Sequence, residues 1–168
     1  MLSLEQVDQV LTVEKTLGGK LAWREDPTNS ARALLVAPLL IDGSAVAGLQ
    51  LQGNALIRVR QQSATILLIV DNDPIQRLSF RPRQDHVNSL RAEVPKELRG
   101  RRLRAGETRF YPWDLNRRWP REQRPRERYD GYELDPAPAA FDEAARFFLS
   151  QCNVVGELPS PPHRPELF

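Results

Sequence analysis

The sequence predicts an α+β protein, in which an antiparallel meander sheet of about five or six strands packs against one N-terminal and one C-terminal helix. Three observations predict this class. Apolar residues recur at helical spacing near both ends of the chain, alternating or continuous apolar runs lie between them, and tight-turn residues separate these runs. A chain of 168 residues with 40% hydrophobic content suits one core, so we assign residues 1–156 to a single domain and residues 157–168 to a proline-rich tail.

The first predicted element is a helix. Ser3, followed by Gln6 three residues later, matches a capping box, and apolar residues share one face as far as Leu17. Gly18 and Gly19 are expected to end this helix.

The strands are predicted from apolar patterning between tight turns. Residues 31–42 form a long apolar run, and Pro38 within it predicts either a sheet edge or a bulge. A second strand over 45–52 is expected to end at a Gly53-Asn54 turn, and a third over 55–62 to point Arg58 and Arg60 outward. The remaining strands are predicted over 65–71, as a central strand buried on both faces, over 75–83, and over 107–111.

The last element is a helix over residues 138–153. Pro138 stands at its start, and Phe141, Phe148 and Cys152 fall on one face. Cys152 is predicted to be a buried thiol.

The net charge of +2 conceals a strong asymmetry. Between Lys96 and Arg128 the chain carries twelve basic and five acidic residues, whereas the rest carries twelve basic and seventeen acidic residues. A basic segment on an acidic body is typical of a protein that directs its field at a polyanion.

The centre of that segment, RFYPWDLNRRWPREQRPRER (109–128), places four aromatic residues among seven arginines. Guanidinium groups bind phosphates and aromatic rings stack on unpaired bases, so we predict binding of RNA or another single-stranded nucleic acid. The predicted contact residues are Arg101, Arg102, Arg104, Tyr111, Trp113, Arg117, Arg118 and Trp119. In the alternative interpretation, the tryptophans fill core space and the arginines pair with the acidic body.

A stronger hypothesis makes the protein a toxin-type ribonuclease. His86 would act as general acid or base, while Arg109 and Glu107 would stabilise the phosphoryl transition state. In the alternative interpretation, His86 has no catalytic role and is a residue of a surface turn beside Asn88, which caps the next segment. The sequence alone leaves open whether the protein is an enzyme.

A hypothesis of another class is a protein-interaction module. Here the basic arm would bind an acidic partner surface or a second copy of the chain, forming a homodimer. We expect no cofactor, and one cysteine with two histidines predicts no zinc site. The sequence does not decide whether a divalent ion joins Asp85, Glu107 and His86.

No long apolar run and no signal-peptide pattern occur in the sequence. We therefore expect a cytoplasmic protein without membrane association.

The order of motifs between Thr65 and Val154 resembles a bacterial family of small proteins of unknown function. In that family a strand leads into a His-x-Asn motif, a histidine pair precedes a tyrosine, and a helix ends in Cys-Asn-Ile or Cys-Asn-Val. The matching residues here are His86, Asn88, Tyr111, Trp119, Cys152 and Asn153.

This chain departs from the family pattern at the histidine pair, where it has Glu107 and Arg109. The resemblance implies a fold and the location of a site, and similar small proteins resemble passengers of mobile elements and toxin–antitoxin systems.

Overall fold

The computed structural model describes residues 3–117 and 129–165 and confirms the α+β class. The described residues form three helices: α1 (Leu4–Thr12), α2 (Trp113–Asn116) and α3 (Phe141–Gln151). The strands are β1 (Lys15–Leu17), β2 (Arg24–Asp26), β3 (Asn29–Ile41), β4 (Ser44–Leu56), β5 (Ser63–Val70), β6 (Asp73–Phe80), β7 (His86–Val87), β8 (Arg102–Leu103), β9 (Arg109–Tyr111), β10 (Tyr132–Glu133) and β11 (Val154–Val155).

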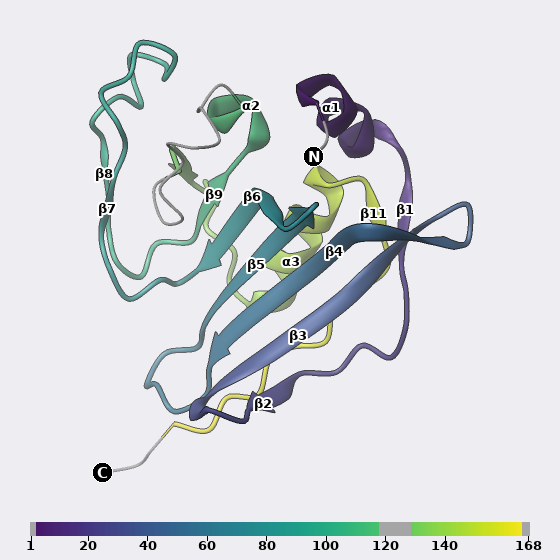
Figure 1. The fold of residues 1–168 in the computed structure, drawn as a ribbon. Coiled ribbons are helices and arrows are strands. Elements are labelled where there is room, and N and C mark those ends of the chain that lie inside the picture. The colour runs from purple at the N-terminus through teal and green to yellow at the C-terminus, as the bar shows by residue number, and fades with distance from the viewer. Residues whose placement is uncertain (1–2, 118–128, 166–168) are drawn as a thin grey trace.

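Nine strands form one sheet in the order β10-β9-β6-β5-β4-β3-β1-β11, with β2 also paired to β3. Neighbouring strands are antiparallel except β1 and β11, which are parallel. The chain leaves this sheet after β6 and returns in β9. In between, residues 81–108 form an excursion in which β7 and β8 make a separate two-stranded sheet (Figure 1).

The sheet is larger than the five or six strands predicted. The central meander of β3 to β6 was predictable because these strands are long, with eight to thirteen residues each. Strand β9 lies within the strand predicted over 107–111. The additional strands have only two or three residues each, too few to show a period in the sequence. They form because distant segments pair with the edges of the meander.

Helix α3 packs on one face of the sheet, on the side away from the viewer in Figure 1. Phe148 and Phe141 of α3 meet Phe110 and Phe80 of the sheet edge-on, with ring centroids 6.1 and 5.9 Å apart. Val7 of α1 joins the same core. Both helices predicted at the ends of the chain are therefore present, and α3 covers one face of the sheet while α1 contributes to the same core.

Helix α1 has the predicted capping box but ends earlier than predicted. Ser3 and Gln6 exchange the two hydrogen bonds of that motif. The helix ends at Thr12, not at Gly18, because Lys15 is fully buried beneath its last turn and Nζ donates to the carbonyls of Val10 and Val13, both at 2.5 Å. A cation satisfies the free carbonyls at a helix C-terminus, which lets the chain continue as β1.

Strand β3 contains the predicted bulge and is not an edge strand. Its register with β4 shifts between Pro38 and Leu40. The other long side of β3 pairs with β1 and β2. The bulge accommodates the missing N–H of proline inside the sheet.

The predicted turn at Gly53-Asn54 is wrong, because β4 runs without a break through both residues. Glycine is required at position 53 because the ring of Trp23 packs directly against the backbone: an added Cβ would lie 2.5 Å from Cη2 of Trp23. The strand ends at Leu56, so Arg58 and Arg60 lie in the β4–β5 connection and not in a strand.

Strand β5 is central, as predicted, but it is not buried along both faces. Thr65 and Leu67 are only half-buried, on the face that α3 does not cover. The uncovered face of the sheet is therefore open at the middle of β5.

Residues 157–165 do not form a free tail. Leu158 is buried in the main core, and the carbonyl of Pro159 accepts a 2.7 Å hydrogen bond from Nε1 of Trp23. The backbone N–H of Arg164 donates to the carbonyl of Ile57 at 2.8 Å. This part of the predicted tail therefore belongs to the domain. In the described ranges, no helix is long and apolar enough to cross a membrane.

We expect Gly53→Ala to lower the free energy of unfolding by about 1 to 3 kcal/mol, because the new methyl group forces Trp23 out of its packed position. Urea denaturation followed by tryptophan fluorescence measures this change. In a Trp23→Leu background the same substitution should cost much less, because the two sites are in direct contact. Equal costs in both backgrounds would show that the close approach is not the cause.

Candidate functional site

His86, Arg77 and Arg109 surround Tyr111. The ring of His86 packs edge-on against that of Tyr111, with centroids 5.3 Å apart. Cζ of Arg77 lies 5.4 Å from the centroid of the tyrosine ring and Cζ of Arg109 lies 6.0 Å from it. We call these four residues the tyrosine cluster. Since Phe110 points to α3, the alternation along β9 places Arg109 and Tyr111 on the opposite face of the sheet.

The imidazole of His86 is neutral at neutral pH. Burial lowers its pKa below the ordinary value of 6.5, and the charge of Arg109 lowers it further. A hydrogen bond with the backbone of Tyr129 and the charge of Asp130 act in the opposite direction but are smaller. Nε2 is buried and has no hydrogen-bond partner among the described residues.

Arg109 anchors the excursion to the sheet. Its side chain is 4% exposed and donates to the carbonyls of Leu103, at 3.1 Å, and Gln84, at 2.9 Å. Burial lowers the pKa of this guanidinium, which nevertheless remains charged. Burial also raises the pKa of Tyr111 above 10.0, so the phenol stays protonated at neutral pH.

The predicted catalytic trio is only partly assembled. His86 and Arg109 come together, but Glu107 is exposed and its Oε2 accepts from the backbone N–H of Arg104 at 3.3 Å. Within the described ranges, Glu107 has no interaction with either of the other two. The prediction that the three residues form one site is therefore wrong for Glu107. In addition, the buried Nε2 of His86 has no access to a substrate in this arrangement.

Asn88, which resembles the asparagine of the His-x-Asn motif, holds two loops together. Its Nδ2 donates to the carbonyls of Leu98 and Gly131, and its Oδ1 accepts from the N–H of Gly131 at 3.0 Å. Beside it, the carboxylate of Asp130 accepts from the N–H and hydroxyl of Ser89. The side chain of Asn88 is buried and all its polar atoms are hydrogen-bonded, so its role is structural.

The aromatic residues predicted to stack on bases do not lie on the surface. Tyr111 and Trp113 are 3% and 1% exposed, and Nε1 of Trp113 donates to Oδ1 of Asp8 at 2.6 Å. Neither ring has a face open to a nucleotide. The predicted stacking by these two residues is therefore corrected in favour of core packing, whereas Arg118 and Trp119 lie outside the described residues.

Most of the described arginines in the predicted segment are already matched with acceptors of the protein itself. Three ion pairs account for predicted contact residues: Arg101 with Glu133 at 2.9 Å, Arg102 with Asp85, and Arg117 with Asp8. Phosphate would have to displace a carboxylate at each of these positions. The described part of the segment therefore does not form the outward basic face that was predicted. Arg104 is the exception, because its side chain is exposed and has no hydrogen-bond or ion-pair partner among the described residues.

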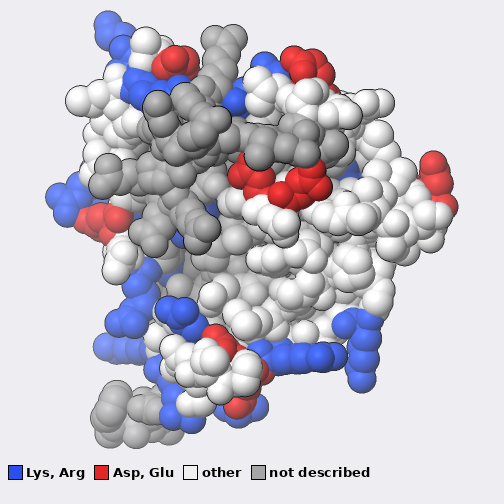
Figure 2. All heavy atoms as spheres, in the orientation of Figure 1, with Lys and Arg blue, Asp and Glu red and all other residues white. Residues whose placement is uncertain are grey.

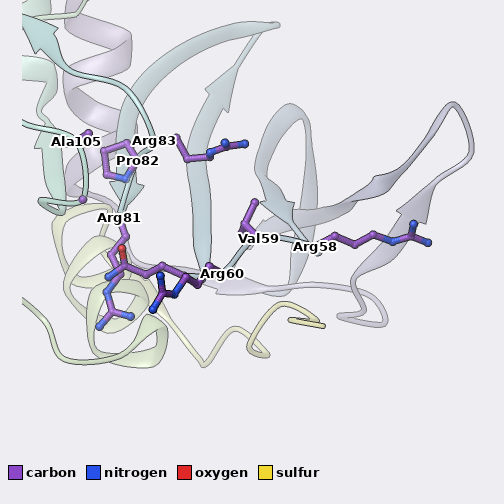
Figure 3. A pocket seen from close by; sticks show the side chains of 9 residues that line it. Arg58, Val59, Arg60, Arg81, Pro82, Arg83 and Ala105 are labelled. Atoms are coloured by element: carbon purple, nitrogen blue, oxygen red, sulfur yellow. The ribbon is translucent and has the colours of Figure 1, made fainter. Parts of the chain in front are cut away.

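A different group of arginines lines a pocket of about 520 Å³ between the β4–β5 connection and the start of the excursion (Figure 3). The lining contains no acidic residue and consists of Arg58, Val59, Arg60, Gln61, Arg81, Pro82, Arg83, Ala105 and Gly106. In Figure 3, Arg60 and Arg81 extend toward the same side of the pocket, whereas Arg58 extends away from them. Arg104 adjoins this pocket through its neighbour Ala105.

The arginines at this pocket have few competing acceptors. Arg60 and Arg83 are exposed, and within residues 3–117 and 129–165 neither makes an ion pair or side-chain hydrogen bond. Arg81 donates to the carbonyl of Ala139 at 2.7 Å and lies over the ring of Phe80. We call Arg60, Arg81, Arg83 and Arg104 the arginine edge.

Sequence reasoning missed the arginine edge because it counted charge along the chain. A signal was present in two short patterns, Arg58-Val59-Arg60 and Arg81-Pro82-Arg83, neither of which has an acidic residue within it. They are 20 residues apart in sequence, and only the β5–β6 hairpin brings them together.

Neither the cysteine nor the potential metal ligands of the described residues form a reactive site. Cys152 is buried as predicted, and burial raises its pKa to about 12, so it is not a nucleophile at neutral pH. In the part of the chain that the structure describes, no group of three or more His, Cys, Asp or Glu is placed to hold a metal ion.

No family model matches this chain, and neither a curated protein nor a solved structure is similar to it. The resemblance to a bacterial family of unknown function therefore stays a prediction, and we infer function from the geometry of the molecule.

We expect the stability of the protein to fall as the pH decreases from about 7 to about 5, because the unfolded chain protonates His86 more readily than the folded protein does. His86→Phe should flatten this dependence, by less than about 1.4 kcal/mol per pH unit. Urea denaturation at several pH values measures the slope. The prediction fails if His86→Phe keeps the wild-type slope.

Proposed function

We propose that the protein binds single-stranded nucleic acid through the phosphates of its backbone, at the arginine edge. The observation that carries this proposal is the arginine-lined pocket without an acidic residue, in which Arg60 and Arg83 have no partner among the described residues. Guanidinium groups that are not matched internally keep their charge and donors for an external anion.

The spread of the arginines favours a polymer over a single phosphate group. A site for one phosphate needs donors that converge on one point. Here the side chains come from three chain segments and extend in different directions (Figure 3). Charges spread along an edge match repeated phosphates, and Figure 2 shows Lys and Arg gathered at the lower left of the molecule, around the ends of these strands.

Binding is favoured over cleavage. A general acid or base must reach the proton that it transfers, and Nε2 of His86 is buried against Tyr111. Glu107, the second predicted catalytic residue, lies elsewhere. The geometry therefore supports a binding protein better than a ribonuclease.

We expect the double substitution Arg60→Ala, Arg83→Ala to weaken binding of a labelled single-stranded oligonucleotide and to reduce its salt dependence. If each arginine neutralises one phosphate, the slope of log K against log salt should become shallower by about 1.4. Fluorescence anisotropy at several salt concentrations measures both quantities.

Two controls locate the effect. Arg146→Ala removes an arginine paired with Asp142 on α3, on the far side of the sheet, and should leave binding unchanged. Arg101→Ala removes an arginine paired with Glu133 and should have a smaller effect than either edge arginine. Binding by the wild type that does not change with salt would overturn the proposal, and tighter binding of a glutamate-rich peptide would favour an acidic protein partner.

A further inference from the structure

The uncovered face of the sheet carries a row of carboxamide side chains along β4. Leu49, Leu51 and Ala55 point into the core. The alternation of the strand therefore places Gln50, Gln52 and Asn54 on the opposite face, where Asn54 is exposed and both glutamines are half-buried. We call these three residues the β4 amide row.

The amide row has no partner in the protein. In the described part of the chain, neither the three amides nor the neighbouring hydroxyl of Thr65 makes a side-chain hydrogen bond. Each amide presents two donors and an acceptor. The row therefore offers hydrogen-bonding atoms at positions that the pairing of β4 with both of its neighbours fixes.

The neighbours of the row are uncharged and in part apolar. By register, Asn54 lies between Leu34 and Thr65, and Gln52 lies between Val36 and Leu67. Val36 is 57% exposed. Figure 2, which faces this side of the sheet, shows a mainly uncharged surface over β3, β4 and β5. A surface of this kind suits a flat, weakly polar group and not a second charged chain.

The amide row is continuous with the arginine edge. Asn54 stands two residues before the end of β4, and Arg58 and Arg60 follow directly in the β4–β5 connection. Thr65 stands near the start of β5, at the same end of the sheet. A strand whose phosphates lie at the arginine edge therefore has its bases within reach of the open face.

We propose that this face binds the bases of the nucleic acid and that the β4 amide row favours adenine. The inference rests on the proposed function. Asparagine and glutamine form paired hydrogen bonds with N6 and N7 of adenine, while the apolar neighbours contact the face of the base. The occupant is thus a single-stranded, adenine-containing segment, and the arginine edge supplies affinity without base preference.

The test compares three probes at one salt concentration: oligoadenylate, oligouridylate of equal length, and inorganic polyphosphate. The wild type should bind oligoadenylate about tenfold or more tightly than oligouridylate. The double variant Gln52→Met, Asn54→Leu keeps the side-chain volume and removes the hydrogen-bonding groups. It should bind both oligonucleotides alike, with an unchanged salt slope and unchanged binding of polyphosphate.

Gln9→Met, on the exposed side of α1, is the matched control and should keep the adenine preference. Circular dichroism of each variant checks that the sheet is intact. Equal binding of both oligonucleotides by the wild type would overturn the base-contact proposal while leaving the arginine edge in place. Loss of polyphosphate binding in the amide variant would also overturn it, and so would preferential binding of a glutamate-rich peptide to the wild type.

If instead the Arg60→Ala, Arg83→Ala variant keeps full affinity and salt slope for all three probes, the proposed function fails at its own site. The two outcomes are distinguishable because one changes base preference at constant salt slope and the other changes the salt slope.

Discussion

The packing of α3 against only one face of the sheet is the constraint on which the rest of the structure depends. Burial on one side produces alternation along β3 and β4, so alternate residues are buried against the core and the residues between them face outward. The opposite face must then be covered in some other way or remain open. The molecule does both: the excursion lies beside β9, and the middle of β3 to β5 stays uncovered.

The excursion covers part of that face, and this explains why Arg109 and Tyr111 of the basic segment are buried. Arg109 donates to two carbonyls of the excursion, and Asn88 ties the excursion to Gly131. These contacts bury Tyr111 and leave two cations, Arg77 and Arg109, near the same ring. Burial lowers the pKa of His86, and the charges of Arg109 and Arg77 lower it further, so the imidazole stays neutral at neutral pH. The tyrosine cluster therefore attaches the excursion to the sheet, and it does so with His86 neutral and both arginines charged.

The sequence predicted the elements whose signals are local. The capping box of α1, the amphipathic face of α3 and the long apolar strands each depend on residues within one segment. It failed where the burial of a particular side chain decides: the buried Lys15 ends α1, and Trp23, far away in the sequence, explains the glycine that resembled a turn. Short strands were missed for the same reason, because their pairing partners are far away in the sequence.

The site was predicted less well than the fold, because a count of charged residues does not say where their side chains point or which acidic residues they contact. Twelve basic residues in one segment predicted a basic face, yet Arg101, Arg102 and Arg117 are paired with acids from other parts of the chain. The two short arginine patterns in the connections of the meander, Arg58-Val59-Arg60 and Arg81-Pro82-Arg83, were not predicted to form a binding site. Arg60 and Arg83 have no side-chain partner among the described residues, because the hairpin places them at a strand end where no acidic side chain lines the pocket.

The division between edge and face has a physical consequence for recognition. Arginines in connecting segments have long, flexible side chains, and their field reaches about 8 to 10 Å at ordinary ionic strength, so they attract phosphates without fixing a register. The amides of β4 are held by eight paired positions with β5. A shift of one residue would turn the amides into the core and the leucines outward, which the burial of Leu49 and Leu51 prevents. The interaction that fixes the fold therefore also fixes the positions of the atoms that are proposed to contact the bases.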